Sequence, residues 1–230
     1  MKINDILEMI EPTVSDVNFS GKLVQHPEPR WNPDNDKKLG GRGNFSTVRP
    51  DKKDPHMVRK NHHSPIMSDI DDQDGYIPFI NHLIRHKLMG EYINLPRVYD
   101  VKKITDREGD YIYSYTIEKL IDGKNVSIEE LNTIIDRTLG DEPAKGMSWS
   151  SREESSVKPK ILNQWFGAQI EYGLTNGFYN IKDEELIKAL KLIDFVNDRN
   201  PNNVTDIHGG NIMYRRTPHG LQLVISDPLA

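Results

Sequence analysis

The chain has 230 residues and a net charge of −5, and hydrophobic residues make up 36% of it. This length accommodates one large domain or two small lobes and is ample for a buried core. The negative charge argues against a general affinity for nucleic acid or anionic membranes. The absence of cysteine excludes a disulfide scaffold, a thiolate nucleophile and a Cys-ligated zinc or iron–sulfur site.

Membrane and export signals are not expected in this sequence. No run of about 18 apolar residues occurs, so no transmembrane helix is predicted. The first residues lack the continuous apolar stretch and the small-residue cleavage site of a secretory signal. We therefore expect a cytoplasmic protein without membrane or direct nucleic-acid partners.

The first 60 residues predict a helix, an extended arm and a hairpin. Apolar side chains at helical spacing indicate a short helix over 3–11. Three prolines between 25 and 38 indicate an extended arm. Strands are expected on both sides of a polar turn at 50–55, and the second of them contains residues 57–60.

Residues 61–120 predict more strands around one helix. Residues 61–75 are acidic and loop-like, and an apolar stripe over 76–89 indicates a helix. Strands are expected at 95–101 and 111–117, with a turn at 108–110 between them. The chain up to residue 120 is thus expected to form antiparallel strands with one inserted helix.

The remainder of the chain is expected to be mostly helical. A capping-box pattern at 127–130 predicts a helix start, and the polar stretch 141–157 predicts a loop. Helices are predicted at 159–173 and 183–198. The last predicted elements are two short strands, 212–214 and 221–225.

A glycine-rich segment is the first candidate for chemistry. It comprises Gly41 and Gly43, followed by Phe45 and Val48. Glycine has no Cβ, so backbone N–H groups at such positions can approach phosphates closely. A hairpin turn built from small residues would give the same pattern, because Gly-x-Gly alone is a weak signal.

The second candidate is Lys60, which follows the apolar residues Met57 and Val58. Side chains two apart on a strand share a face, so Val58 and Lys60 are expected to point the same way. Val58 would then cover a flat base while Lys60 reaches its phosphates. The alternative is an exposed lysine on a strand.

Three polar residues near the end of the chain complete the candidates. Asp206 and Asn211 are separated by two glycines, which suits a tight loop that turns both side chains to one point. Such a carboxylate can accept a proton from a hydroxyl nucleophile, and an Asn oxygen can bind a hard cation. Asp227 follows an apolar strand, where metal ligands occur in many phosphotransferases. The alternatives are an ordinary Asx/Gly turn and a strand terminator.

In this order, the motifs resemble the protein-kinase superfamily from residue 39 to the end. The resemblance implies an α+β, kinase-like two-lobed fold with a truncated C-terminal lobe. Residues 1–38 would be an N-terminal helix and arm, and residues 39–120 the N-lobe with its antiparallel sheet and one helix. Residues 121–230 would be a reduced helical C-lobe that carries the catalytic loop and a metal-binding Asp.

The same resemblance implies roles for individual residues, with ATP and Mg²⁺ as cofactors. Asp206 and Lys60 would be catalytic, and Asn211 and Asp227 would bind the metal. Residues 117–120 resemble the stretch from gatekeeper to hinge, where backbone groups meet the adenine edge. The residues implied to bind the nucleotide are Gly41, Gly43, Phe45, Val48, Val58, Lys60, Glu118 and Leu120.

Four short blocks, at 39–46, 95–101, 206–213 and 226–228, are similar to a narrower family. They resemble the kinase domain of the early serine/threonine protein kinase of podoviruses that infect enteric bacteria. That resemblance implies a phage protein that works in a bacterial cytoplasm, phosphorylates host proteins and helps to shut off host transcription.

The sequence also departs from the protein-kinase pattern. Val204 and Thr205 stand where regulated kinases carry His-Arg, and His208 stands where they carry Lys. The helix at 76–89 offers no obvious Glu to pair with Lys60, although Asp72, Asp74 and Glu91 flank it.

Further departures lie at the end of the sequence. Pro228 and Leu229 replace Phe-Gly, and the sequence ends three residues past Asp227. That ending predicts that the activation segment and the subdomain that hold a peptide are missing.

Two other functions therefore stay open. The first is a pseudokinase-like module that binds and inhibits a host protein. The second is a small-molecule kinase, because aminoglycoside and choline kinases often carry His at the position of His208.

Overall fold

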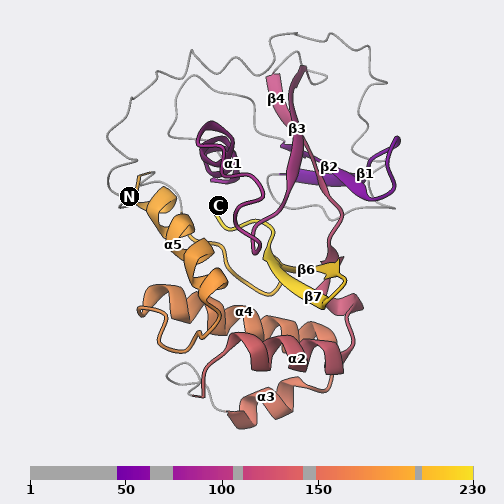
Figure 1. Ribbon diagram of the computed structural model, residues 1–230. Coiled ribbons are helices and arrows are strands. Elements are labelled where there is room, and N and C mark those ends of the chain that lie inside the picture. Colours follow the sequence, from indigo (N-terminus) through magenta and orange to yellow (C-terminus); the bar gives the residue numbers. More distant parts are fainter. Residues whose placement is uncertain (1–45, 63–74, 106–110, 142–148, 200–203, 230) are drawn as a thin grey trace.

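The chain is an α+β protein in the computed structural model shown in Figure 1. The structure describes residues 46–62, 75–105, 111–141, 149–199 and 204–229. The predicted helix at 3–11, the arm at 25–38 and the loop and turn at 61–75 and 108–110 lie largely or wholly outside these residues. Gly41, Gly43 and Phe45 also lie outside them.

Four antiparallel strands form the larger sheet. They are β1 (Ser46–Pro50), β2 (Met57–His62), β3 (Val98–Thr105) and β4 (Tyr111–Glu118). Their spatial order is β1-β2-β4-β3, so β2 lies between two partners. The strand–turn–strand prediction and the strand predicted at 111–117 are confirmed for the described residues. The strand predicted at 95–101 is correct only in part: it begins at Val98 and runs to Thr105, because the Leu95 N–H donates to the Tyr92 carbonyl in a turn before it.

Helix α1 (Tyr76–Arg85) packs with the larger sheet and buries one side of its surface. It ends four residues before the predicted end at 89, and the physical reason is its C-terminal cap. Lys87 adopts a left-handed conformation, with φ of 57°. The N–H groups of Lys87 and Leu88 donate to the carbonyls of Ile84 and Leu83, so the last turn closes back on itself.

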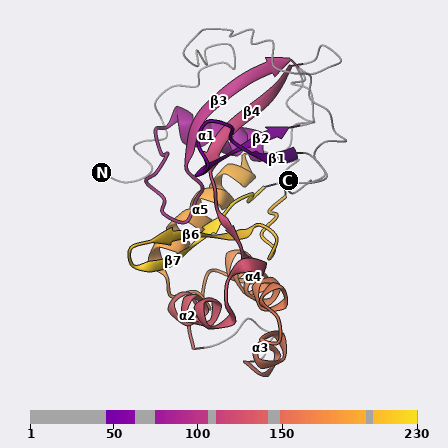
Figure 2. The ribbon, with the colours of Figure 1, turned by 90° about the vertical axis from the view of Figure 1, so that its right-hand side faces the viewer.

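A second, smaller sheet is formed by segments from the middle and the end of the chain. It contains β5 (Ile121–Asp122), β6 (Ile212–Thr217) and β7 (Gly220–Ile225), in the order β5-β6-β7. A single 3₁₀ turn, Gly123–Asn125, leads from β5 towards the helices. Figures 1 and 2 show this small sheet between the larger sheet and the helices α2, α3 and α4. The final two predicted strands are confirmed, whereas β5 was not predicted.

The helices of the second half match most predictions. They are α2 (Ile128–Thr138), α4 (Pro159–Thr175) and α5 (Glu184–Asp198). The predicted capping box is present, since the Ser127 side chain accepts from the Glu130 N–H and the Glu130 carboxylate accepts from the Ser127 N–H.

The prediction of a loop over 141–157 is wrong in part, because α3 (Trp149–Ser155) forms there. Tertiary contacts hold this short helix. The Arg152 guanidinium donates to the Asn132 and Asp136 side chains of α2 at 2.7 Å each. These contacts override the weak helix propensity of a serine-rich stretch.

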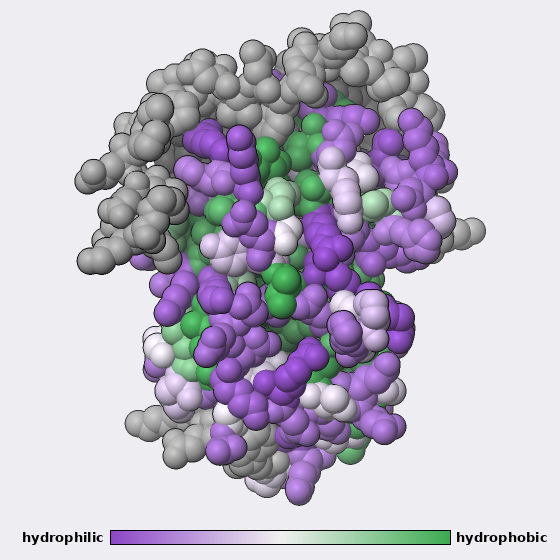
Figure 3. All heavy atoms as spheres, in the orientation of Figure 1, coloured by the Kyte–Doolittle hydropathy of each residue, from purple (hydrophilic) through white to green (hydrophobic). Residues whose placement is uncertain are grey.

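One continuous hydrophobic core joins the two sheets and the helices. It runs from α1 and β4 through α2, α4 and α5 to β6 and β7. On the face shown in Figure 3, hydrophilic residues predominate and hydrophobic ones appear only in small patches between them. Within the described ranges, no helix combines the length and the apolar composition needed to cross a membrane.

Candidate active site

The register of the larger sheet fixes the direction of Lys60. Val48 on β1 and Tyr115 on β4 lie directly opposite Lys60, and Ile117 lies opposite Val58. Cross-strand partners and residues two apart share a face, so Val48, Val58 and Lys60 point to the same side. The expected common face of Val58 and Lys60 is confirmed. The alternative of an exposed strand lysine is wrong, because Lys60 is only 4% exposed.

Among the described residues, two groups contact the Lys60 ammonium. Its Nζ lies 2.6 Å from Oδ2 of Asp227, which is 167 positions away in the sequence. The same nitrogen lies 3.4 Å from the centre of the Tyr76 ring, at the start of α1. The ammonium therefore joins β2, α1 and the segment that follows β7.

Asp206 and Asn211 are brought together by the loop between them. The Asn211 side-chain amide donates to the Asp206 carboxylate at 2.9 Å and to the Asp206 backbone carbonyl at 2.7 Å. The N–H of Asn211 also donates to the carbonyl of His208 at 2.9 Å. The predicted tight loop, with both side chains turned to one point, is confirmed.

Backbone hydrogen bonds connect this loop to the segment of Asp227. The N–H of Asp206 donates to the Pro228 carbonyl at 2.9 Å, and the N–H of Ser226 donates to the Asn211 carbonyl at 2.8 Å. Asp227 thus lies between two residues that are bonded to the two ends of the loop. The pair of Lys60 and Asp227 and the pair of Asp206 and Asn211 therefore lie on neighbouring segments.

Helix α4 supports the loop between Asp206 and Asn211. The Asn163 side chain donates to the carbonyls of Gly209 and Ile212, at 2.6 and 3.1 Å. Gly209 approaches the helix so closely that a Cβ there would lie 2.5 Å from Cα of Gln164. Glycine is required at this position because any side chain would lift the loop off α4.

His208 lies beside the Asp206 carboxylate. Its Nδ1 accepts a hydrogen bond from the N–H of Gly210 at 2.9 Å. In the neutral ring the proton is therefore on Nε2, which lies 3.5 Å from Oδ1 of Asp206. The His208 and Asp206 side chains are 57% and 40% exposed, so this side of the loop is open to solvent.

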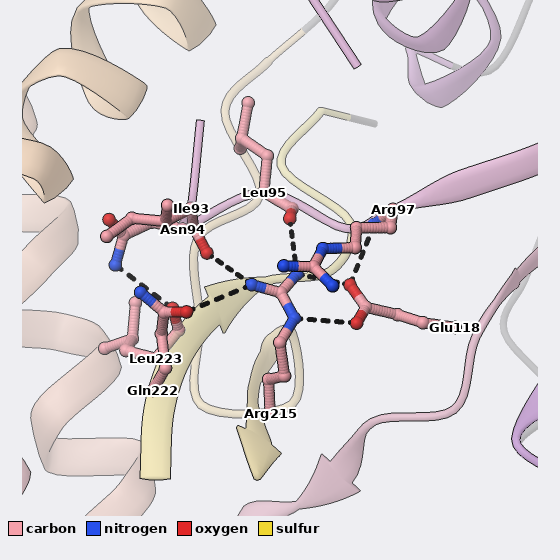
Figure 4. A network of polar contacts seen from close by, with 8 residues as sticks. All are labelled: Ile93, Asn94, Leu95, Arg97, Glu118, Arg215, Gln222 and Leu223. Atoms are coloured by element: carbon pink, nitrogen blue, oxygen red, sulfur yellow. Dashed lines mark hydrogen bonds and ion pairs between the residues drawn. The ribbon is translucent and has the colours of Figure 1, made fainter. Parts of the chain in front are cut away.

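The Glu118 carboxylate takes part in a buried network, which Figure 4 shows. It accepts from the Arg215 guanidinium, at 2.7 Å from Nε and also from Nη2, and from the N–H of Arg97 at 2.8 Å. Arg215 donates further to the carbonyls of Ile93 and Leu95. The Glu118 side chain thus links the two sheets. Its N–H donates to the Arg97 carbonyl at 3.0 Å, so neither group is left for the predicted hinge role. Leu120 follows between β4 and β5 and is half-buried.

Two residues of this region were not found from the sequence. Tyr76 gave no signal, because an aromatic residue at the start of an amphipathic helix is usually a core residue. Arg215 gave none either, because its partner Glu118 is 97 positions away. Ion pairs and ring contacts between distant segments leave no spacing pattern.

The donor set near Asp227 suits Mg²⁺ only together with phosphates. Among the described residues, no group of three His, Asp or Glu side chains is arranged to hold a metal. Because the Asn211 amide nitrogen donates to Asp206, its oxygen is the atom that would face a cation. Mg²⁺ commonly takes one or two carboxylates and completes its shell with water and substrate phosphates. Asn211 and Asp227 fit that pattern.

Comparison with known proteins adds no relative. A scan against protein-family models finds no match for this chain, and no curated protein matches its sequence.

Proposed function

We propose that this protein is an ATP- and Mg²⁺-dependent phosphotransferase with a protein-kinase-like fold, which acts on serine and threonine hydroxyls of proteins. The observation that carries the proposal is the convergence of Lys60, Asp206, Asn211 and Asp227. These side chains come from β2, from the loop before β6 and from the segment after β7. A lysine, a proton acceptor and two oxygen ligands for a cation are the groups that phosphoryl transfer requires.

Lys60 would bind the phosphates of ATP. An ammonium is a compact charge that suits phosphate oxygens, and burial strengthens its electrostatic attraction. Val48 and Val58 lie on the same side of the sheet as Lys60 and would cover the base. The backbone of Leu120 would meet the adenine edge, and the segment with Gly41, Gly43 and Phe45 would cover the phosphates.

Asp206 would accept the proton of the acceptor hydroxyl. The hydroxyl oxygen forms a bond to the γ-phosphorus, the bond from that phosphorus to the β–γ bridging oxygen breaks, and ADP leaves. The amide of Asn211 orients the Asp206 carboxylate. Mg²⁺, bound by Asn211, Asp227 and phosphate oxygens, would offset the charge on the transferred group.

The acceptor is proposed to be a host protein. The four blocks that resemble the early kinases of podoviruses support a phage protein that phosphorylates host proteins in the bacterial cytoplasm and contributes to transcription shut-off. Three of these blocks include described residues of the site or its supports, namely 95–101, 206–213 and 226–228.

Phosphate transfer from labelled ATP to proteins of a bacterial lysate tests the proposal. The purified chain with Mg²⁺ is expected to label serine and threonine residues, which mass spectrometry would identify. Chelation of Mg²⁺ is expected to stop the labelling. Absence of transfer with Mg²⁺ present would reject the enzymatic function.

A second candidate is a module that binds nucleotide without transferring phosphate. It is favoured by the contact between Lys60 and Asp227, because the described part of α1 supplies no acid to Lys60. Mg·ATP would raise the melting temperature of such a module, since a ligand that binds only the folded state stabilises it. A thermal shift without phosphate transfer would therefore indicate the second function.

A small-molecule kinase is favoured by the position of His208 beside Asp206. In the same lysate experiment, this function would place the label in the acid-soluble fraction instead of in protein.

A further inference from the structure

Helix α1, over Tyr76–Arg85, offers Lys60 an aromatic ring and no carboxylate. Nζ of Lys60 lies 3.4 Å from the centre of the Tyr76 ring, well inside the range of cation–π contacts. Tyr76 is fully buried and Lys60 is 4% exposed, so little water screens this contact. An ammonium over the face of an aromatic ring is attracted by the negative charge of that face, and more strongly where water is excluded.

Neighbouring rings fix the orientation of Tyr76. The His62 ring stacks on it, with centroids 5.2 Å apart and planes inclined by 20°. The Tyr115 ring meets it edge-on, at 5.5 Å and 89°. His62 lies two residues after Lys60 on β2, and Tyr115 lies opposite Lys60 on β4. The sheet that carries the lysine therefore also holds the ring that the lysine contacts.

An aromatic partner has a different electrostatic consequence from an acidic one. A carboxylate would neutralise the ammonium and compete with phosphate oxygens for its N–H donors. The face of a ring attracts the cation but carries no net charge, so it leaves those donors available. When Asp227 is engaged with a cation, Tyr76 would remain in contact with Lys60.

We propose that Tyr76 is a positioning residue for Lys60, which holds the ammonium towards the phosphates of ATP through the face of its ring. This inference rests on the proposed phosphotransferase function. It also links the position of α1 to phosphate binding, because Tyr76 is the first residue of that helix.

Substitutions at position 76 separate the ring from its bulk. Tyr76→Phe keeps the aromatic face and is expected to keep KM for ATP within about 2-fold of the original value. Tyr76→Leu removes the face and is expected to raise KM for ATP by about 10-fold. Phe79→Leu is the matched control, since it removes another fully buried ring of the same helix, and KM is expected to stay unchanged.

A graded series covers the case in which Tyr76→Leu does not fold. Fluorinated phenylalanines at position 76 keep the shape of the ring while they withdraw charge from its face. KM for ATP is expected to rise with each added fluorine. A KM that is independent of fluorination would overturn the inference, as would a folded Tyr76→Leu variant with unchanged KM.

A readout without ATP separates this inference from the proposed function. The rate at which acetic anhydride modifies Lys60 in the ligand-free protein can be measured by mass spectrometry. Tyr76→Leu, or the most fluorinated ring, is expected to raise that rate by about 10-fold, and Tyr76→Phe is expected to leave it unchanged. If the protein transfers no phosphate, the function fails, and the labelling rates still decide whether Tyr76 holds Lys60. Equal rates in all variants would reject that role.

Discussion

Asp227 contacts the buried Lys60, whereas Asp206 does not, so substitutions of the two carboxylates should have different effects on stability. Asp227 neutralises the buried Lys60 and would also bind the cation, whereas Asp206 is 40% exposed and hydrogen-bonds to Asn211 within its loop. The two carboxylates should therefore differ in stability effects even if both are essential for transfer.

We predict that Asp206→Asn and Asp227→Asn each lower the rate of phosphate transfer by about 10²–10³-fold. Only Asp227→Asn should also destabilise the fold, because it leaves the Lys60 ammonium buried beside a neutral amide. The cost is expected below about 3–5 kcal/mol, since the Asp227 side chain is 32% exposed. Labelled ATP and urea denaturation measure the two effects. Unchanged transfer in both variants would contradict the assigned roles.

Among single residues, the sequence identified those whose position depends on residues nearby in the chain. Asp206 and Asn211 were predictable because their loop is short and its glycines are adjacent. Lys60 was predictable because strand periodicity fixed its face. Tyr76 and the pair of Glu118 and Arg215 were not predictable, because each depends on contacts across 16 or more positions that only tertiary packing creates.

Among the elements, α1 and α5 meet at a group of basic side chains. The His82 ring of α1 lies 4.4 Å from the His86 ring and 5.9 Å from the Phe195 ring of α5. Burial, followed by the positive charges of His86, Arg199 and Arg85, lowers the pKa of His82 from 6.5 to about 4. His82 is therefore neutral in the folded protein at pH values where it is charged in the unfolded chain.

This lowered pKa predicts how acid acts on the contact between the two helices. Between pH 6.5 and 4 the unfolded state binds a proton that the folded state does not, so the free energy of unfolding falls as the pH falls through this window. The contribution is fully present above pH 6.5. We expect a shallower fall in His82→Gln, measured by urea denaturation at several pH values. His219→Gln, in the exposed β6–β7 turn, should keep the original slope. Parallel curves for all three proteins would contradict the prediction.

The elements that the sequence predicted have strong internal signals. Capping residues and apolar periodicity marked α2, α4 and α5 within a few residues. The sequence did not predict α3, because its main supports are contacts of Arg152 with another helix. The predicted length of α1 was too great, because Lys87 rather than a glycine takes the left-handed position after the helix.

Over the whole molecule, the Glu118–Arg215 pair joins parts that are distant in sequence. It connects the end of β4, the segment at 93–97 and β6, and its side chains are only 11% and 9% exposed. Removal of one partner leaves the other charge buried and unpaired, which typically costs about 3–5 kcal/mol.

We predict that Arg215→Met destabilises the protein by about 3–5 kcal/mol. Substitution of both partners, Glu118→Leu with Arg215→Met, should recover part of the loss, because no charge is then left buried. Arg216→Met is the matched control: its side chain is 68% exposed and its ion pair with Glu130 spans 3.9 Å, so a change within about 0.5 kcal/mol is expected. Urea denaturation measures all three. Equal losses for Arg215→Met and Arg216→Met would show that the buried pair does not join the sheets.

The pairing of β2 with both β1 and β4 has a consequence for length changes in this protein. A one-residue insertion within β2 that shifted its register would turn Lys60 to the opposite face of the sheet, away from Asp227 and Tyr76. Extra residues at the tip of the β1–β2 turn would leave both ladders in place. Natural or engineered variation in length should therefore be tolerated at the tip of this hairpin and excluded from its arms.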